Sequence, residues 1–130
     1  MNKKRNLDLN KGSRSQKSVA KGERRAVLYL ILHGYRIVER NYLLGHKEID
    51  IIAKKGNTYA FIEVKSRRGA AIAPMFSVNA AKKRNVASAA AMYAAKNGLR
   101  KQVLRFDIIE VDLSRKWPLN GVNHIENAFE

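Results

Sequence analysis

Residues 48–65 read EIDIIAKKGNTYAFIEVK, and this stretch decides the fold. Two largely apolar runs, 48–54 and 58–65, flank a Gly56-Asn57 dipeptide, a known connection of two-residue β-hairpins. The stretch therefore predicts two antiparallel strands. Both runs also carry acids, which strands usually disfavour, so the acids need an explanation of their own.

The predicted hairpin brings these acids together. A two-residue loop places Asp50 directly opposite Glu63, and Glu48 opposite Lys65, on one face of the sheet. Opposed Cβ atoms lie about 4.5–5.5 Å apart, so like charges there destabilise the hairpin. A shared proton, the Lys65 ammonium or a divalent cation can offset this repulsion. The alternative is that the carboxylates simply face water in a basic protein. A one-residue slip of the register would move one acid to the other face and remove the pairing.

A cation held by these acids has a definite chemistry. A metal ion bound by Asp50 and Glu63 can activate water and polarise a phosphoryl oxygen. The Lys65 ammonium can orient the attacking water or stabilise charge on the pentavalent phosphorus. The pattern therefore favours phosphodiester hydrolysis, with Mg²⁺ or Mn²⁺ as cofactor.

The chain is strongly basic, with 26 Lys and Arg against 11 Asp and Glu and a formal charge of +15. No acid lies between Glu63 and Asp107, so local salt-bridge partners are missing there. This segment holds ten basic residues: Lys65, Arg67, Arg68, Lys82, Lys83, Arg84, Lys96, Arg100, Lys101 and Arg105. We therefore predict a nucleic-acid partner, bound through its phosphates.

The rest of the chain predicts one α/β domain with a mixed sheet flanked by helices, in the order α-β-β-β-α-β. We expect helices at 18–33 and 77–97 and further strands at 35–42 and 103–112, with a weak strand at 122–125. Ser18 could cap the first helix, and Gly34 and Gly98 could end the two helices. Residues 1–17 are polar and basic and predict a flexible arm, which leaves 18–130 as the domain.

One acid of the first predicted helix is out of place. Val27, Leu30 and Ile31 form an apolar stripe at helical spacing, and four residues before Val27 lies Glu23. An acid in line with a core stripe is costly unless it is paired. The alternative is that Glu23 simply favours the positive N-terminal end of its helix, and spacing alone leaves both explanations open.

The composition excludes several classes of protein. There are no cysteines, which excludes disulfides and thiolate metal sites and fits a reducing, cytoplasmic location. The basic start is followed by no apolar segment of a secretory signal. No apolar run approaches the roughly 18 residues of a membrane span, so no membrane partner is predicted.

The spacing Asp50, twelve residues, then Glu63-x-Lys65 resembles the core of the PD-(D/E)xK nucleases. More closely, residues 19–130 resemble the YraN family of uncharacterised bacterial proteins, which are related to archaeal Holliday-junction resolvases. The resemblance rests on KGERRAVLYLILHGY, RN, EIDII, FIEVKSR, the basic helix 77–97, RFDIIEV and NAF. Two positions depart from it: Lys47 replaces a usual glycine, and Ile49 replaces the proline of the superfamily's name.

The resemblance implies a restriction-endonuclease-like core whose active site contains Glu23, Asp50, Glu63 and Lys65, with the three acids as metal ligands. It favours the active-site explanation of Glu23. The predicted phosphate-binding residues are Arg67 and Arg68, directly after the motif, and Lys82, Lys83 and Arg84 on the second helix.

Three functions stay open. The first is a metal-dependent endonuclease acting on DNA, such as branched or damaged structures. Cutting a junction needs two active sites, which makes a homodimer attractive. The second is a catalytically silent nucleic-acid-binding accessory protein with a nuclease fold. The third is a basic structural protein of a ribonucleoprotein, whose salt-sensitive RNA binding would be indifferent to the acids.

Overall fold

The computed structural model describes residues 14–45, 47–69, 80–116 and 120–128. The elements in these residues are α1 (Arg14–Leu32), β1 (Arg36–Leu44), β2 (Lys47–Lys55), β3 (Thr58–Arg67), α2 (Ala80–Lys96), β4 (Val103–Asp112) and β5 (Val122–Ile125).

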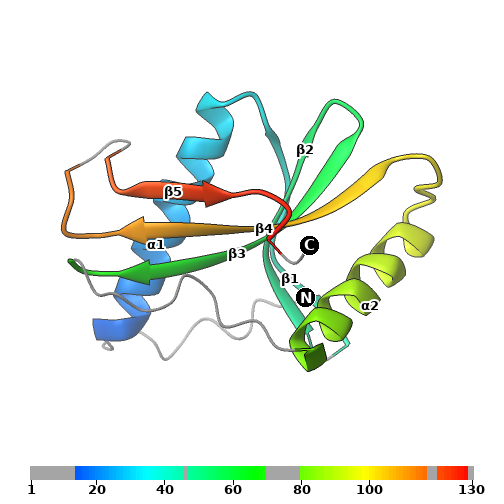
Figure 1. The fold of residues 1–130 in the computed structure, drawn as a ribbon, viewed down its shortest axis with the longest axis horizontal. Helices are drawn as coiled ribbons and strands as arrows, with labels where there is room; N and C mark the ends of the chain where they lie inside the picture. The colour runs from blue at the N-terminus through cyan, green and yellow to red at the C-terminus, as the bar shows by residue number, and fades with distance from the viewer. Residues whose placement is uncertain (1–13, 46, 70–79, 117–119, 129–130) are drawn as a thin grey trace.

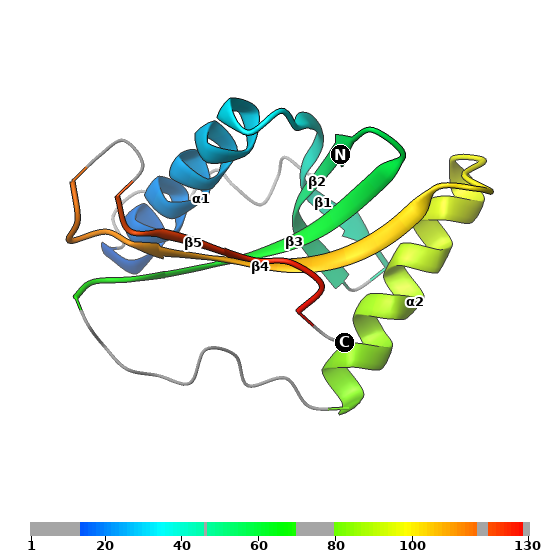
Figure 2. The same cartoon turned by 45° about the horizontal axis from the view of Figure 1, so that its top comes forward.

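The five strands form one mixed sheet in the order β1-β2-β3-β4-β5. β3 and β4 are parallel, and the other neighbouring strands are antiparallel. The parallel pair needs a long crossover connection, which contains α2. α1 covers one face of the sheet and α2 the other (Figure 1 and Figure 2). The predicted α/β class with a mixed sheet is confirmed, and β5 forms where a weak strand was expected.

The β2–β3 hairpin has the predicted register. Its pairs run from Lys55–Thr58 beside the turn to Ile51–Ile62. Gly56 has a φ of 61°, a left-handed conformation that glycine adopts without strain. The two-residue turn therefore fixes the register, as the sequence predicted.

The start of α1 differs from the prediction. The helix begins at Arg14, so Ser18 lies inside it and is not its N-cap. The predicted boundary between an arm at 1–17 and a domain from 18 falls within this helix, while residues 1–13 lie outside the described residues. Ser18 was misread because serine is a common cap but is also tolerated inside helices.

The end of α1 follows the prediction. Gly34 has a φ of 91°, its N–H donates to Ile31 O at 3.1 Å, and the Tyr35 N–H donates to Leu30 O at 2.9 Å. These two bonds form a Schellman motif, which satisfies carbonyls at the last turn.

Two apolar clusters hold the helices to the sheet. The cluster on the α1 side contains Ala26, Leu30, Tyr35, Ile51, Ala53, Ala60, Ile62, Ile109, Val111 and Leu113. The cluster on the α2 side contains Leu44, Ile49, Ile52, Phe61, Ala89, Ala90 and Tyr93. The predicted stripe on α1 needs one correction, because Ile31 is 51% exposed and the inward face runs through Ala26 and Leu30.

A buried polar network ties β5 to β4. Asp107 of β4 accepts hydrogen bonds from Arg105 Nε at 2.9 Å, Arg105 Nη2 at 2.8 Å and Asn127 N at 3.0 Å. His124 Nε2 of β5 lies 2.8 Å from its second oxygen. Burial alone would raise the pKa of Asp107, but the bonds from His124 and Arg105 hold it below its ordinary value. The network therefore fastens the last strand to the sheet through one ionised carboxylate.

Neither of the two described helices is long and apolar enough to cross a membrane.

Candidate active site

β2 and β3 part where the acids begin. In the described hairpin the last backbone pair is Ile51–Ile62, and pairing does not continue to Asp50 and Glu63. β3 continues alongside β4 past this point, whereas β2 continues alongside β1. The predicted register is confirmed, but the two acids lie at a fork between strands rather than in a paired ladder.

β2 also twists at this fork. Residues two apart on a regular strand share a face. Ile49, however, packs in the cluster on the α2 side, and Ile51 packs in the cluster on the α1 side. The residue between them, Asp50, is therefore placed where the strand changes the side to which it packs.

Asp50 spans the fork with its side chain. The Val64 N–H donates to Asp50 Oδ2 at 2.8 Å. The pKa of Asp50 is raised to about 6, mainly by burial and also by the charges of Glu63 and Glu48, while the Val64 bond and Lys65 act in the opposite direction. The carboxylate is therefore largely ionised at pH 7, at a free-energy cost that a bound cation would offset.

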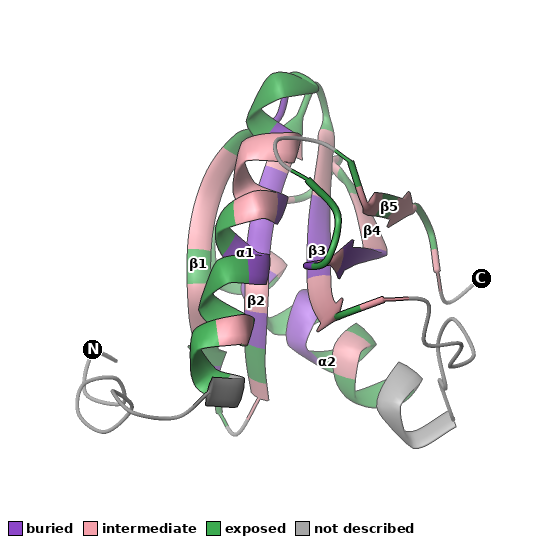
Figure 3. Cartoon of the chain, turned by 90° about the vertical axis from the view of Figure 1, so that its left-hand side faces the viewer, coloured by how far each residue is buried: buried purple, intermediate pink, exposed green. Residues whose placement is uncertain are grey.

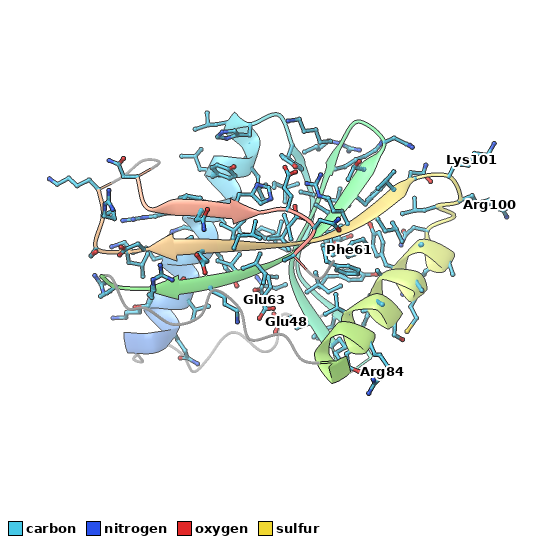
Figure 4. The ribbon with its side chains drawn as sticks, in the orientation of Figure 1. Glu48, Phe61, Glu63, Arg84, Arg100 and Lys101 are labelled. Atoms are coloured by element: carbon cyan, nitrogen blue, oxygen red, sulfur yellow. The ribbon has the colours of Figure 1, made fainter. Side chains whose placement is uncertain are left out.

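Glu63 and Lys65 lie on the same face of β3, with Val64 between them. Lys65 Nζ is 3.2 Å from Glu63 Oε2, and the side chains are 41% and 32% exposed, respectively. The two groups are thus paired but open to solvent. Figure 4 shows Glu48 and Glu63 directed toward the same region below β3. The charges of Glu48, Glu63 and Lys65 all act on Asp50, so these residues are neighbours, but the predicted direct opposition of Glu48 and Lys65 is not among the β2–β3 pairs.

Glu23 reaches this region from α1. It lies well inside a helix that begins at Arg14, so the alternative explanation of an acid at the helix N-terminus is wrong. Gly22 lets the helix approach the sheet, because a Cβ there would overlap Ser66 Oγ of β3. Glu23 is consequently 8% exposed and close enough to Asp50 to feel its charge.

The charge of Glu23 is only partly compensated. Its pKa is raised to about 7, mainly by burial and also by the charges of Asp50 and Glu48, while Arg40 and a hydrogen bond from Asn41 act in the opposite direction. Glu23 and Asp50 therefore both have raised pKa values, which is common where carboxylates are gathered for function.

Asn41 holds an unusual backbone conformation beside these acids. Its φ is 51°, and it lies in β1 between residues that pair with Ile51 and Ile49 of β2. Asparagine tolerates this left-handed region better than most residues, and strained residues cluster at functional sites. Sequence reasoning noted Asn41 only within the family motif RN and gave it no role.

The structure places the predicted phosphate-binding residues in different surroundings. Arg68 and Arg84 are exposed. Arg67 instead faces the buried Glu110, with Nη1 3.8 Å from Oε2, and its Nε has no hydrogen-bond partner among the described residues. The side chains of Lys82 and Lys83 lie outside those described.

Sequence reasoning missed the buried acids of β4. Glu110 is 6% exposed and accepts a hydrogen bond from Asn123 Nδ2 at 3.1 Å, in addition to its ion pair with Arg67. Asp107 is bound by Arg105 and by residues near the C-terminus. Acids at 107 and 110 within an apolar strand were the available signal, but their partners come from distant segments.

The donor set at the fork fits a hard divalent cation. Mg²⁺ is usually held by one or two carboxylates together with water and substrate phosphates. Asp50 and Glu63 supply such a pair, and the raised pKa of Asp50 marks negative charge that lacks full compensation. No group of three or more His, Asp or Glu in the described part of the chain is arranged to hold a metal ion. The fit is therefore to the pair of carboxylates from Asp50 and Glu63, and the role of Glu23 as a third ligand stays a prediction.

Comparison with known proteins identifies the family. The model described as "Uncharacterised protein family UPF0102" matches residues 22–111. A UPF0102 protein of Clostridioides difficile (strain 630) is 44% identical over 109 residues, covering 83% of this chain and 92% of the relative. A UPF0102 protein of Geobacter metallireducens is 40% identical over 112 residues, covering 85% and 90%.

The similarity extends over nearly the whole chain in a third relative. A UPF0102 protein of Geobacter sulfurreducens is 36% identical over 127 residues, covering 95% of this chain and 98% of the relative. The matched segment contains Glu23, Asp50, Glu63 and Lys65 and runs to the buried part of β4. The resemblance noted in the sequence is thereby confirmed at the level of the family, and the protein belongs to the UPF0102 family.

Proposed function

We propose that this chain is a divalent-cation-dependent nuclease of the PD-(D/E)xK kind that hydrolyses phosphodiester bonds in DNA. One observation carries the proposal: Asp50, Glu63 and Lys65 gather where β2 and β3 part, and Glu23 reaches them from α1. The resemblance to resolvases favours branched DNA as substrate. Two cuts would then be needed, so a homodimer belongs to the proposal.

Asp50 and Glu63 would hold the cation, which supplies a more acidic water and polarises a phosphoryl oxygen when bound. The Val64 N–H fixes Asp50 Oδ2 at 2.8 Å, so the orientation of this carboxylate is set before substrate arrives. Preorganised groups of this kind are a main source of catalytic stabilisation.

Lys65 is the group suited to the developing charge. Its ammonium lies 3.2 Å from Glu63 Oε2, which restrains it at the fork, yet 41% of the side chain is exposed. It can therefore approach a phosphate while it remains anchored. Glu23 is suited to exchange a proton near neutral pH, since its pKa is about 7.

The exposed cations provide contacts for the phosphate backbone. Arg68 follows the active strand, and Figure 4 places Arg84 near one end of α2 and Arg100 and Lys101 beyond the other end. We keep Lys82 and Lys83 in this role from their sequence position. Arg67 we assign to structure instead, because it faces the buried Glu110.

The test is a substrate panel of labelled four-way junction, flap, duplex and single-stranded DNA with Mg²⁺ or Mn²⁺. We expect cleavage by the wild type, and a loss of about 100-fold or more in Asp50→Ala and Glu63→Ala, since each removes a group acting in the transition state. Glu126→Gln is the matched control, because Glu126 is an exposed acid that pairs with Arg105 away from the fork. Equal background rates in all four proteins would refute the proposal.

A silent binding protein is the second candidate. The Lys65–Glu63 ion pair favours it, because Lys65 already offsets one of the acidic charges without a cation. Calorimetric titration with Mn²⁺ distinguishes the nuclease from the silent binding protein. The nuclease requires Mn²⁺ binding that the Glu63→Ala substitution abolishes. DNA binding without any such cation binding would support the silent protein.

A further inference from the structure

The outward face of α1 carries a line of cations. Four basic residues lie on one face of the helix, because their spacing is four residues, then three, then one. They are Lys17, Lys21, Arg24 and Arg25. Lys17, Lys21 and Arg24 are exposed, and Arg25 is half-buried. We refer to these four residues as the α1 basic stripe. Figure 3 shows α1 in front of the sheet, with much of its outward surface exposed.

The helix gives this stripe no acidic partner of its own. Glu23 is the sole acid in the sequence of α1, and it is buried against the sheet on the opposite side. Like charges three or four residues apart destabilise a helix. The stripe therefore has an arrangement that an external anion would stabilise.

The surface at the stripe is concave and partly fixed. Among the described residues, Lys21, Arg24, Arg25 and Leu28 line a hollow of about 440 Å³. Arg25 Nη1 donates to Arg115 O in the β4–β5 connection at 3.1 Å, which ties this guanidinium to a second segment. Arginine offers several donors in a planar fork and binds phosphate oxygens well.

The stripe and the candidate active site belong to the same helical turns. Gly22 lies against Ser66 of β3, and Glu23 lies close enough to Asp50 to interact with its charge. The neighbouring Lys21 and Arg24 are exposed to solvent. The stripe therefore lies on the outward side of the same helical turns that bring Glu23 to Asp50. From residue 17 to residue 25 the helix rises about 12 Å, a length over which a DNA duplex presents about seven phosphates.

We propose that the α1 basic stripe binds the phosphate backbone of a DNA duplex outside the cleaved segment. This inference rests on the proposed function for the identity of the polymer. A lipid surface fits less well, because helices that lie on membranes present an apolar face beside the basic one. The face of α1 that contains Ala26 and Leu30 is instead covered by the sheet. Of the exposed apolar side chains on this helix, Ile31 and Leu32 lie in its last turn, beyond the stripe, and Val19 lies on another side of the helix.

The test measures binding in EDTA, by fluorescence anisotropy of a labelled duplex at several salt concentrations. The stripe variant is Lys17→Gln/Lys21→Gln/Arg24→Gln. The matched control is Arg36→Gln/Lys54→Gln/Lys55→Gln, which removes the same charge at the hairpin end of the sheet, where Arg36 pairs with Lys54. We expect the stripe variant to bind about tenfold or more weakly and its salt slope to fall by about 2–3, with much smaller changes in the control.

Equal losses in both variants would show an effect of net charge alone and overturn the inference. Unchanged affinity of the stripe variant for the duplex would also overturn the inference, whether or not this variant loses binding to phosphatidylglycerol vesicles. The readout is independent of cutting. If the wild type cleaves DNA but the stripe variant binds DNA normally, the proposed nuclease function stands and the role of the stripe is refuted. If the stripe variant binds DNA more weakly but the wild type never cleaves DNA, the role of the stripe stands and the nuclease function is refuted.

Discussion

Glu23 shows how one side chain can serve a site at the expense of the fold. It is an acid inside α1 with 8% of its surface exposed, and burial raises its pKa from 4.5 to about 7. The folded state therefore binds a proton more tightly than the unfolded state. Between those two pKa values the stability falls as the pH rises, and above pH 7 the whole penalty is present.

Glu23→Gln should consequently stabilise the protein at pH 8. The gain is on the order of 3 kcal/mol, because each pH unit between the folded and unfolded pKa values corresponds to about 1.4 kcal/mol. Urea unfolding at pH 8 and pH 4 measures it. At pH 4 both states of the wild type are largely protonated at this position, so the advantage should nearly vanish. An equal gain at both pH values would contradict the assignment.

Asn41 permits a second prediction at this scale. It combines a φ of 51° with a hydrogen bond to Glu23. Asn41→Ala should destabilise the protein by about 2 kcal/mol, since alanine disfavours this conformation and makes no such bond. Asn41→Gly should lower the free energy of unfolding by less, because glycine adopts this backbone conformation without strain, although the hydrogen bond to Glu23 is still lost. Urea unfolding of both variants checks the order, and a more damaging glycine would contradict it.

At the scale of elements, the approach of α1 to β3 depends on one missing side chain. A Cβ at Gly22 would overlap Ser66 Oγ, which is buried without a hydrogen-bond partner among the described residues. Gly22→Ala should destabilise the fold by about 2 kcal/mol through overpacking and should move Glu23 away from Asp50.

A double-mutant cycle with Ser66→Ala tests this contact. Ser66→Ala alone should be nearly neutral, because it removes an unsatisfied hydroxyl. In the double variant it should recover part of the loss caused by Gly22→Ala. Additive free energies of unfolding would show that the two residues do not meet.

The attachment of β5 depends on Asp107. The pKa of this acid in the folded state lies below its ordinary value. Its contribution to the free energy of unfolding is therefore fully present when the pH is above that ordinary pKa, and it is lost as the pH falls through the folded-state pKa. Asp107→Asn should cost about 3 kcal/mol at pH 7, because it leaves the partly buried Arg105 without its main partner. Urea unfolding measures this, with Glu126→Gln as the control on the exposed partner of Arg105. Similar losses in both variants would contradict the role.

At the scale of the whole molecule, a cation bound only by the folded chain must stabilise it. At Mn²⁺ concentrations about 100-fold above the dissociation constant, the free energy of unfolding should rise by about 2.7 kcal/mol. Thermal unfolding with and without EDTA measures the effect. It should be absent in Asp50→Asn and weaker at pH 5, where protonation of Asp50 competes with the cation. A rise retained in Asp50→Asn would place the cation elsewhere.

The sequence predicted what local rules control. The Gly56-Asn57 turn set the hairpin register, so Asp50, Glu63 and Lys65 could be placed near one another. The class of fold and the glycine that ends α1 followed from similar local signals. The fork itself could not be predicted, because the loss of pairing beyond Ile51 depends on how β1 and β4 draw the two strands apart.

Long-range partners were equally hidden from the sequence. Asp107 meets His124 only because β4 and β5 are adjacent, and no spacing rule connects the two residues. Arg67 resembled a phosphate clamp, yet a buried acid on the next strand faces it. The left-handed backbone at Asn41 arises inside a strand, where sequence patterns predict an extended one.

The bond from the Val64 amide to Asp50 Oδ2 makes the site observable by spectroscopy. Most amides of a sheet donate to backbone carbonyls, whose charge does not change with pH. This one donates to a titrating carboxylate, so its nitrogen and proton chemical shifts should follow the ionisation of Asp50 directly. A single resonance in the middle of β3 would thus report proton or ligand binding at the fork without any added label.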